Sequence, residues 1–144
     1  MKIEKMNLSH INSIQEIENE SFEVPWRYDS FVSDIENSSS INLVCKIDRQ
    51  IVGYCMGWIV EKEFQLNNIC ILEDFRKNKY GYLLLIHLLE LLEILECEKI
   101  FLEVDEANYK AINLYEKVGF VVSYTRRKYY KNKNDALVMF RSIM

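Results

Sequence analysis

The chain has 144 residues, of which 49% are hydrophobic and 28% are charged, as expected for one soluble globular domain spanning residues 1–144. Its 18 basic and 22 acidic residues give a net charge of −4, which argues against a protein that grips a nucleic-acid backbone. With four glycines and one proline, the chain has no room for long flexible linkers.

The first part of the chain predicts one strand followed by two helices. The strand covers residues 2–6, and Ser9 is expected to cap the helix that follows. This helix carries apolar residues at a spacing of three and polar residues on its outer side: Ile11, Ile14 and Ile17 inside, Gln15, Glu16 and Glu18 outside. Pro25 ends that unit, and Tyr28–Glu36 predicts a second, short helix before a polar loop at 37–40.

Three strands and a long helix are predicted in the middle of the chain. Residues 41–47 and 51–60 read as a hairpin, and residues 65–72 read as the third strand. A polar and basic segment follows, and after Gly81 a helix is expected over residues 82–96. Its polar side chains recur every three positions, which leaves one thin solvated stripe on an otherwise buried helix: His87, Glu90, Glu93 and Glu96.

The last part of the chain alternates strands with one helix. A strand at 99–104 precedes a helix that Asn108 can cap and that runs through Lys117, with Gly119 just beyond its end. Two final strands are expected at 120–130 and 136–143, around a turn at 132–134. The order βααβββαβαββ predicts an α/β (α+β) fold, with a mixed, partly parallel sheet and helices on its faces.

The cysteines argue against a metal site and for a reducing compartment. Four cysteines without C-x-x-C spacing and only two histidines give no pattern for zinc, so no metal is expected: Cys45, Cys55, Cys70 and Cys97. Two disulfides could form, but buried reduced thiols are the simpler reading, and we expect a cytoplasmic protein. The N-terminus lacks a signal-peptide pattern, and no apolar run approaches the ~18 residues of a membrane span.

The most suggestive local pattern is a strand, a basic loop and a helix. Residues 68–72 are strand-like, and the loop after them carries Arg76, Lys77 and Lys79 just before Gly81. A helix N-terminus offers unpaired N–H groups and a partial positive charge, so this unit could cradle a pyrophosphate. The loop lacks the several glycines of a P-loop or a dinucleotide fingerprint, and spacing alone favours an ordinary solvated loop.

Two further residues could carry chemistry. Glu103 lies within an apolar strand, where it is either a general base whose pKa is raised by partial burial or a carboxylate that points to solvent. The pattern does not separate these two readings. Tyr115 shares a helix face with Leu114 and Val118, so it reads first as a core aromatic and second as a phenol acid.

Longer runs of the sequence resemble the GNAT superfamily of acyl-CoA-dependent N-acyltransferases. The matching runs are N-I-C-I-L-E-D-F-R-K-N-K-Y-G-Y-L-L-L from Asn68 and L-E-V-D-E-A-N-Y-K-A-I-N-L-Y-E-K-V-G-F from Leu102. Within the superfamily the chain is most similar to the bacterial ribosomal-protein-alanine N-acetyltransferases. Three outlying pieces carry that likeness: E-x-x-S-F-x-x-P-W from Glu18 to Trp26, R-R-K-Y-Y from Arg126 to Tyr130, and Asp135-Ala136.

The resemblance implies a GNAT fold, in which a mostly antiparallel sheet contains one splayed parallel strand pair and has helices on both faces. It implies acetyl-CoA as co-substrate, held by the third strand, the loop and two helix starts: Ile69, Cys70, Ile71, Arg76, Lys77, Asn78, Lys79, Tyr80, Gly81, Tyr82 and Asn108. Glu103 would take a proton from the acceptor amine, and Tyr115 would give one to the departing thiolate. Trp26 and Tyr130 would contact the acceptor.

The implied activity is acetylation of the N-terminal alanine of a ribosomal protein, with no nucleic-acid or membrane partner. Other acceptors stay open, namely a polyamine, an antibiotic amine or another protein N-terminus. Asp105 stands where many relatives have Arg, and with Glu103 and Glu106 it would favour a cationic acceptor. The sequence leaves the oligomeric state open.

One departure from the family pattern favours a different class of protein. The family motif R/Q-x-x-G-x-G/A has Gly where this chain has Lys79. If the loop needs a positive φ there, Lys costs about 1–2 kcal/mol, although its charge could reach phosphate. A catalytically weak acyl-CoA-binding module is therefore the alternative to an enzyme.

Overall fold

The computed structural model describes residues 1–130 and 134–143, and within them the predicted order of strands and helices is confirmed. The strands are β1 Lys2–Lys5, β2 Ser40–Ile47, β3 Gln50–Val60, β4 Glu63–Ile71, β5 Lys99–Asp105, β6 Val121–Arg126 and β7 Ala136–Ser142. The helices are α1 Ile11–Ser21, α2 Tyr28–Glu36, α3 Tyr80–Ile94 and α4 Tyr109–Lys117, with short 3-10 helices η1 Leu8–His10 and η2 Glu73–Phe75. The predicted turn at 132–134 lies largely outside the described residues.

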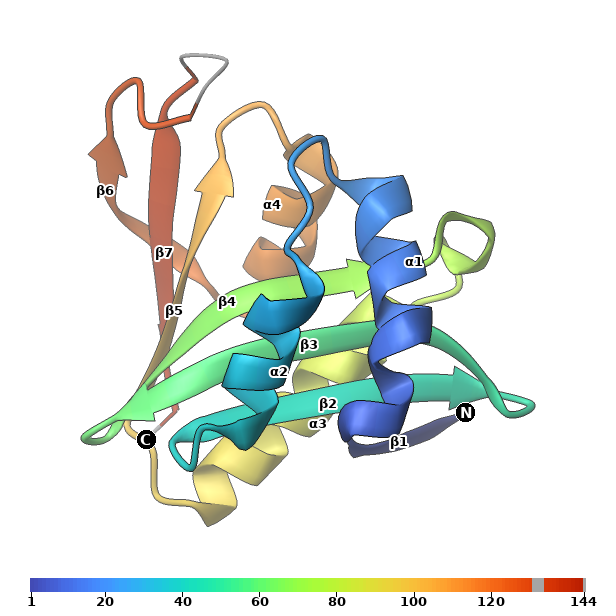
Figure 1. The fold of residues 1–144 in the computed structure, drawn as a ribbon. Coiled ribbons are helices and arrows are strands. Elements are labelled where there is room, and N and C mark those ends of the chain that lie inside the picture. The colour runs from blue at the N-terminus through green and yellow to red at the C-terminus, as the bar shows by residue number, and fades with distance from the viewer. Residues whose placement is uncertain (131–133, 144) are drawn as a thin grey trace.

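The strands form one sheet in the order β1-β2-β3-β4-β5-β7-β6 (Figure 1). Strands β4 and β5 run parallel, and the other neighbouring pairs are antiparallel. The predicted mixed, mostly antiparallel sheet with one parallel pair is therefore confirmed. Because helix α3 connects the two parallel strands, it packs across one face of the sheet (Figure 1).

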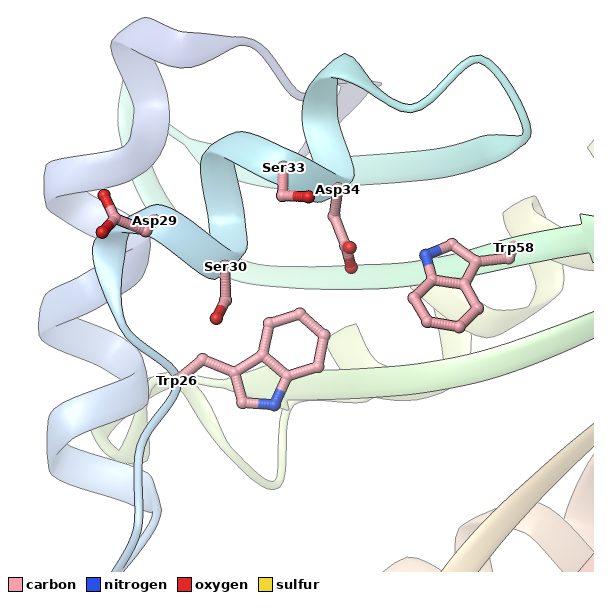
Figure 2. Close-up of a pocket in the computed structure, with 6 residues that line it drawn as sticks. All are labelled: Trp26, Asp29, Ser30, Ser33, Asp34 and Trp58. Atoms are coloured by element: carbon pink, nitrogen blue, oxygen red, sulfur yellow. The ribbon is translucent and has the colours of Figure 1, made fainter.

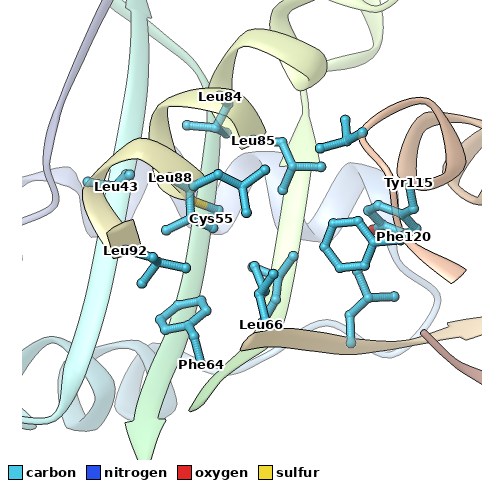
Figure 3. Close-up of a cluster of buried hydrophobic side chains, with 14 of the residues drawn as sticks. Leu43, Cys55, Phe64, Leu66, Leu84, Leu85, Leu88, Leu92, Tyr115 and Phe120 are labelled. Atoms are coloured by element: carbon cyan, nitrogen blue, oxygen red, sulfur yellow. The ribbon is translucent and has the colours of Figure 1, made fainter. Parts of the chain in front are cut away.

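Helices cover both faces, and each face has its own hydrophobic core. Helix α3 and helix α4 pack over the larger core, in which the leucines of α3 meet apolar residues of β2 to β5 (Figure 3). Helices α1 and α2 cover the opposite face, where Ile11, Ile14 and Ile17 pack with Phe31 and Tyr54. The alternation of side chains along each strand thus supplies two buried surfaces, one for each pair of helices.

The parallel pair separates after four rungs. Residues 63–66 of β4 pair with residues 99–102 of β5, and beyond Leu66 the two strands share no further pairs. Strand β4 continues beside β3 to Ile71, while β5 continues beside β7 to Asp105. The splay that the family resemblance implies is therefore present, since β4 and β5 diverge beyond Leu66 and Leu102.

A β-bulge lies where the splay begins. Met56 of β3 faces Asn68, and the next residue, Gly57, faces Leu66, so Asn67 is an extra residue on β4. The extra residue shifts which side chains face the larger core, from Leu66 before the bulge to Ile69 after it. The bulge therefore changes which side chains of the splayed β4 segment face each side of the sheet.

Some local predictions were wrong. The first helical turn is capped by Asn7, which accepts a hydrogen bond from the Ser9 N–H (2.9 Å), because the chain enters α1 through the short helix η1. Glu18 was expected on the outer face, but it is 1% exposed. The exposed stripe of α3 is wider than predicted, since Ile94 is also exposed. Strand β6 ends at Arg126 and does not continue to 130.

The cysteines and the helices agree with two further expectations. All four cysteines are free and buried, as predicted for reduced thiols. Asn108 caps α4 by accepting the Ala111 N–H (3.2 Å), and Gly119 follows the helix with φ +98°. In the described part of the chain, no helix is both long enough and apolar enough to cross a bilayer.

Candidate active site

The loop before α3 adopts an unusual backbone. Lys77 and Lys79 both have positive φ angles, +69° and +64°, and the second of them is the N-cap of α3. Its side chain makes no capping hydrogen bond, and the first bond from the helix to the loop joins the Leu83 N–H to the Lys79 carbonyl (2.9 Å). The N–H groups at the helix start therefore stay open to an anion, with two lysines beside them, and these residues fit a pyrophosphate.

Arg76 fixes this loop to the sheet and to α1. Its Nε donates to the Ile71 carbonyl (2.8 Å), and one terminal nitrogen donates to the Ser21 hydroxyl (3.0 Å). These bonds tie the end of β4 to the last turn of α1. Contact of Arg76 with a cofactor stays a prediction, as it does for Asn78, Tyr80, Gly81 and Tyr82.

The splayed end of β4 presents apolar side chains. Ile69 and Ile71 are half-buried and pack against the larger core, while Cys70 is buried against the smaller one. Burial raises the pKa of the Cys70 thiol, so it is neutral at physiological pH. An apolar strand edge of this kind suits the pantetheine arm of coenzyme A, and that contact stays a prediction.

Glu103 directly follows Leu102, the last residue of β5 that pairs with β4. Ile100, Leu102 and Val104 point into the larger core, so Glu103 lies on the opposite face, the one covered by α1 and α2. Its side chain is 24% exposed and forms an ion pair with Arg126 (3.1 Å). The residue is thus neither deeply buried nor fully solvated, and the ion pair fixes its carboxylate beside the splay.

Tyr115 lies on the other side of the sheet, on α4. It is 7% exposed and belongs to the larger core, where its ring centroid is 5.7 Å from that of Phe120. Burial raises the pKa of its phenol, and Cys70 and Tyr130 raise it further. The hydroxyl therefore carries its proton at neutral pH, as a general acid must.

The pKa of Tyr130 responds to Glu103 and Asp105, the acidic residues beside the splay. Burial raises its pKa to about 12, with further contributions from Glu103, Asp105 and Tyr129. Asp105 holds the turn after β5, where its Oδ1 accepts the Ala107 N–H (2.9 Å). The structure thus brings Glu103, Tyr115 and Tyr130 into one electrostatic neighbourhood.

Glu18, which was predicted on the solvent side of α1, is a buried carboxylate that anchors this region. Glu18 accepts hydrogen bonds from Asn68 (2.7 Å), from the Trp26 N–H (2.9 Å) and from the Tyr54 hydroxyl. It thereby joins the α1–α2 loop to the splayed part of β4 and to β3. The only sequence sign of this role was that Glu18 begins the E-x-x-S-F-x-x-P-W piece. Helical periodicity alone placed the residue on the outer side of α1.

Comparison with known proteins identifies relatives of this chain. Residues 11–120 match the model of the acetyltransferase (GNAT) family. A Bacillus subtilis protein provisionally named ribosomal protein bS18-alanine N-acetyltransferase is 36% identical over 98% of this chain and 95% of its own length.

Solved structures agree with this result. The ribosomal-protein-S18-alanine N-acetyltransferase of Escherichia coli is 28% identical and superposes with a TM-score of 0.93, over 99% of this chain and 93% of that one. A Thermoplasma acidophilum PaiA N-acetyltransferase in complex with coenzyme A has the same fold, with a TM-score of 0.83 at 15% identity over 98% of both chains.

Proposed function

This chain belongs to the GNAT family of acetyltransferases, and from that premise we propose that it transfers the acetyl group of acetyl-CoA to the N-terminal alanine of a ribosomal protein. The observation that carries the proposal is the splay of β4 from β5. It is flanked by the basic loop at 76–79 at one end and by Glu103 and Tyr115 on opposite faces.

We assign the incoming amine to the face covered by α1 and α2. Glu103 is on this face, and Trp26 reaches it from the loop between the two helices. An α-amine with a pKa near ~8 is partly protonated at neutral pH and must lose a proton before it attacks. The Glu103 carboxylate, oriented by Arg126, would accept that proton directly or through water.

We assign the cofactor to the side of α3 and α4. Acetyl-CoA, when bound, supplies the acetyl group as a thioester. The backbone N–H groups at the start of α3, with the charge of Lys77 beside them, would hold its pyrophosphate, and Ile69 and Ile71 would line its pantetheine arm. Asn108 uses its side-chain oxygen to cap α4, so the amide nitrogen is its group for a cofactor contact.

Tyr115 would supply the proton that the departing thiolate takes up. Its phenol is neutral in this burial, and it can donate from Oη to a departing thiolate whose ordinary pKa is about 8.5. We also propose that residues 1–144 act as one GNAT domain, and that it works in the cytoplasm, since its four buried free thiols suit a reducing compartment.

The test is an acetylation assay with the purified protein, acetyl-CoA and peptides from ribosomal protein N-termini, read by mass spectrometry. We expect the bS18 peptide to gain the mass of one acetyl group at its N-terminal amine. The same peptide with a blocked amine serves as the negative control.

A small-amine panel in the same assay separates the alternatives. Turnover of a polyamine or an antibiotic amine without turnover of the peptide would replace the proposed acceptor. Binding of acetyl-CoA without turnover of any amine would identify an acyl-CoA-binding module.

A further inference from the structure

An open pocket lies on the α1–α2 face, between α2 and the end of β3 (Figure 2). Its volume is about 380 Å³. Its lining combines two indole rings, two carboxylates and two hydroxyls: Trp26, Asp29, Ser30, Ser33, Asp34 and Trp58. No basic side chain is among these lining residues, so the pocket is both aromatic and acidic.

Asp34 is the unusual member of this set. It is 8% exposed, and its Oδ2 has no hydrogen-bond partner among the described residues. Its carboxylate points away from α2 toward the space between the two tryptophans (Figure 2). Buried polar atoms are nearly always paired, and a buried carboxylate is costly without a donor or a cation.

Neighbouring side chains compensate this carboxylate only in part. Burial raises the pKa of Asp34, and the Trp58 side chain opposes that rise. An indole has only one N–H to offer, and the Oδ2 atom of Asp34 has no donor among the described residues. A ligand that brings a positive charge and several N–H donors would complete the site.

The aromatic rings favour the same kind of ligand. Trp26 is half-buried in the loop before α2, and Trp58 is 38% exposed on β3. A cation that rests against an indole face is attracted by the ring, and tryptophan is the strongest partner for this interaction. Asp29, Ser30 and Ser33 add acceptors at the exposed rim.

The pocket adjoins the proposed acceptor path. Trp26 is tied through Glu18 to Asn68, in the splayed part of β4. Trp58 pairs with Gln65, one residue before the last rung of the parallel pair. An extended peptide advances about 3.3 Å per residue, so a peptide that runs from the splay along this face could reach the pocket within its first few residues.

We propose that this pocket binds a lysine or arginine side chain of the acceptor peptide, at one of the first few positions after the acetylated residue. The proposal rests on the proposed function, which it extends to the choice of acceptor. It assigns the recognition of positive charge to Asp34, Trp26 and Trp58, apart from the acidic residues at the splay.

The first experiment measures kcat/KM for alanine-terminated hexapeptides that differ only by Lys, Arg or Gln at one position. The wild-type protein should prefer a basic residue by about tenfold at one position. In Asp34→Asn, which keeps the side-chain shape, the ratio of basic to neutral rates should fall to near one. Glu36→Gln removes an exposed charge from the same helix and should keep the wild-type ratio.

A second experiment does not need turnover. Trp26 and Trp58 are the only tryptophans of the chain, and both line this pocket, so intrinsic fluorescence reports on it directly. Titration with the basic hexapeptide should change the fluorescence, the neutral peptide should require a higher concentration, and Asp34→Asn should remove the difference.

The outcomes separate the two proposals. Fluorescence-detected charge-selective binding without acetylation would refute the proposed function and leave the pocket assignment standing. Equal binding of the basic and neutral peptides, or a preference that persists in Asp34→Asn, would overturn the pocket assignment. Tighter binding of spermidine than of the basic peptide would overturn the assignment to a peptide side chain.

Discussion

Glu103 is held beside the splay by its ion pair with Arg126, on the face from which we expect the amine to arrive. Glu103→Gln keeps the size and hydrogen bonding of the side chain but cannot accept a proton. We expect kcat to fall by about 10²–10⁴ at neutral pH. The deficit should shrink above the amine pKa of ~8, where the acceptor is already unprotonated.

Steady-state rates of Glu103→Gln over a pH series measure this effect. Glu116→Gln is a suitable control, because it removes an exposed carboxylate from α4. A fall below about tenfold at neutral pH would remove Glu103 from the mechanism.

Tyr115 is both a core residue and the candidate acid, and one substitution separates these roles. Tyr115→Phe removes one oxygen and almost no volume, so the free energy of unfolding should change by about 1 kcal/mol or less. Turnover should fall by about 10²-fold, with little change in acetyl-CoA affinity. Chemical denaturation, turnover and calorimetry together give the three values.

Tyr109→Phe, at an exposed position of the same helix, is the matched control for Tyr115→Phe. If Tyr115→Phe is as active as the wild type but has a much lower melting temperature, Tyr115 is a purely structural residue.

At single residues, sequence patterns locate apolar side chains better than buried polar ones. The isoleucines of α1 are buried as their spacing predicts. Glu18 lies on the same helix, at a position predicted to be exposed. It is buried because its partners Tyr54 and Asn68 come from strands far along the chain. A polar side chain can be buried only where such donors meet it, and helical periodicity carries no information about them.

Among the structural elements, the start of α3 departs most from expectation for its residue types. Lys79 has a left-handed backbone that costs a residue with a Cβ about 1 kcal/mol. Lys79→Gly should therefore raise the free energy of unfolding by up to about 1 kcal/mol and at least preserve acetyl-CoA binding. Denaturant titration and calorimetry check both values.

Lys77→Ala is the counterpart to Lys79→Gly, since it removes a neighbouring charge from the same loop. It should weaken acetyl-CoA binding, and the binding of the wild-type protein should weaken as salt rises. A large loss of affinity in Lys79→Gly would mean that the Lys79 charge itself holds the phosphate.

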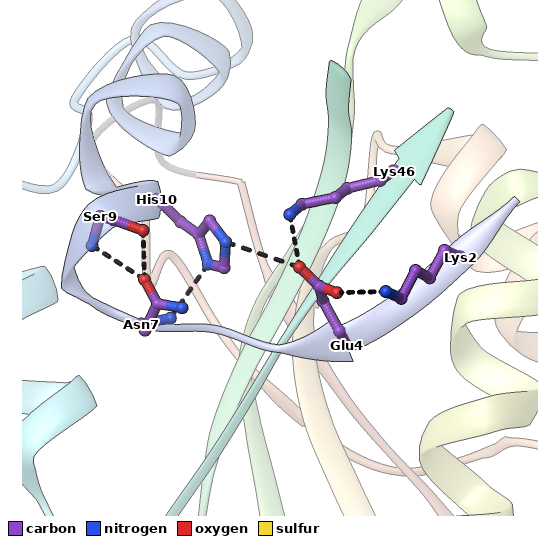
Figure 4. A network of polar contacts seen from close by, with 6 residues as sticks. All are labelled: Lys2, Glu4, Asn7, Ser9, His10 and Lys46. Atoms are coloured by element: carbon purple, nitrogen blue, oxygen red, sulfur yellow. Dashed lines mark hydrogen bonds and ion pairs between the residues drawn. The ribbon is translucent and has the colours of Figure 1, made fainter. Parts of the chain in front are cut away.

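The entry into α1 contains a pH-sensitive contact (Figure 4). The buried His10 Nδ1 accepts the Asn7 N–H (3.0 Å), and its Nε2 lies 3.7 Å from Glu4, which also pairs with Lys46. Burial and the charge of Lys46 lower the pKa of His10, although Glu4 opposes this. The unfolded chain therefore takes up the proton first as pH falls.

Stability from His10 should be complete above its ordinary pKa of about 6.5 and should be lost as pH falls through the lower folded value. His10→Gln keeps an acceptor for the Asn7 N–H but does not titrate. Urea unfolding at about pH 7.5 and about pH 5 should show a smaller acid loss in the variant. Equal losses in both proteins would contradict this assignment.

Local patterns predicted the bounds of some elements but not how the strands pair. Helix α2 has the predicted bounds, because Phe31, Val32 and Ile35 mark its buried side. The bulge at Asn67 gave no sign in the sequence, since one extra residue on β4 is fixed by the register against β3. Strand β6 was predicted too long, because its apolar and aromatic residues resemble a strand beyond Arg126.

For the whole molecule, the order of elements predicted a mixed, partly parallel sheet with helices on its faces, and the structure has this form. The separation of β4 from β5 was expected only from the family resemblance, because no residue pattern states where a strand pair ends. The resulting division is simple. Glu103, Trp26 and Asp34 lie on the α1–α2 side, and the basic loop at 76–79 and Tyr115 lie on the α3–α4 side.

The four pairs between β4 and β5 also join two continuous parts of the chain. Strands β1 to β4 belong to the first part, and strands β5 to β7 belong to the second. A cut in the connection at 95–98 therefore yields two fragments, each with its own paired strands. The fragments should re-form the active protein when mixed, because the larger core spans both. If acetyl-CoA contacts both fragments as proposed, it should tighten their association, so the cut chain would report acyl-CoA levels by the amount of reassembled protein.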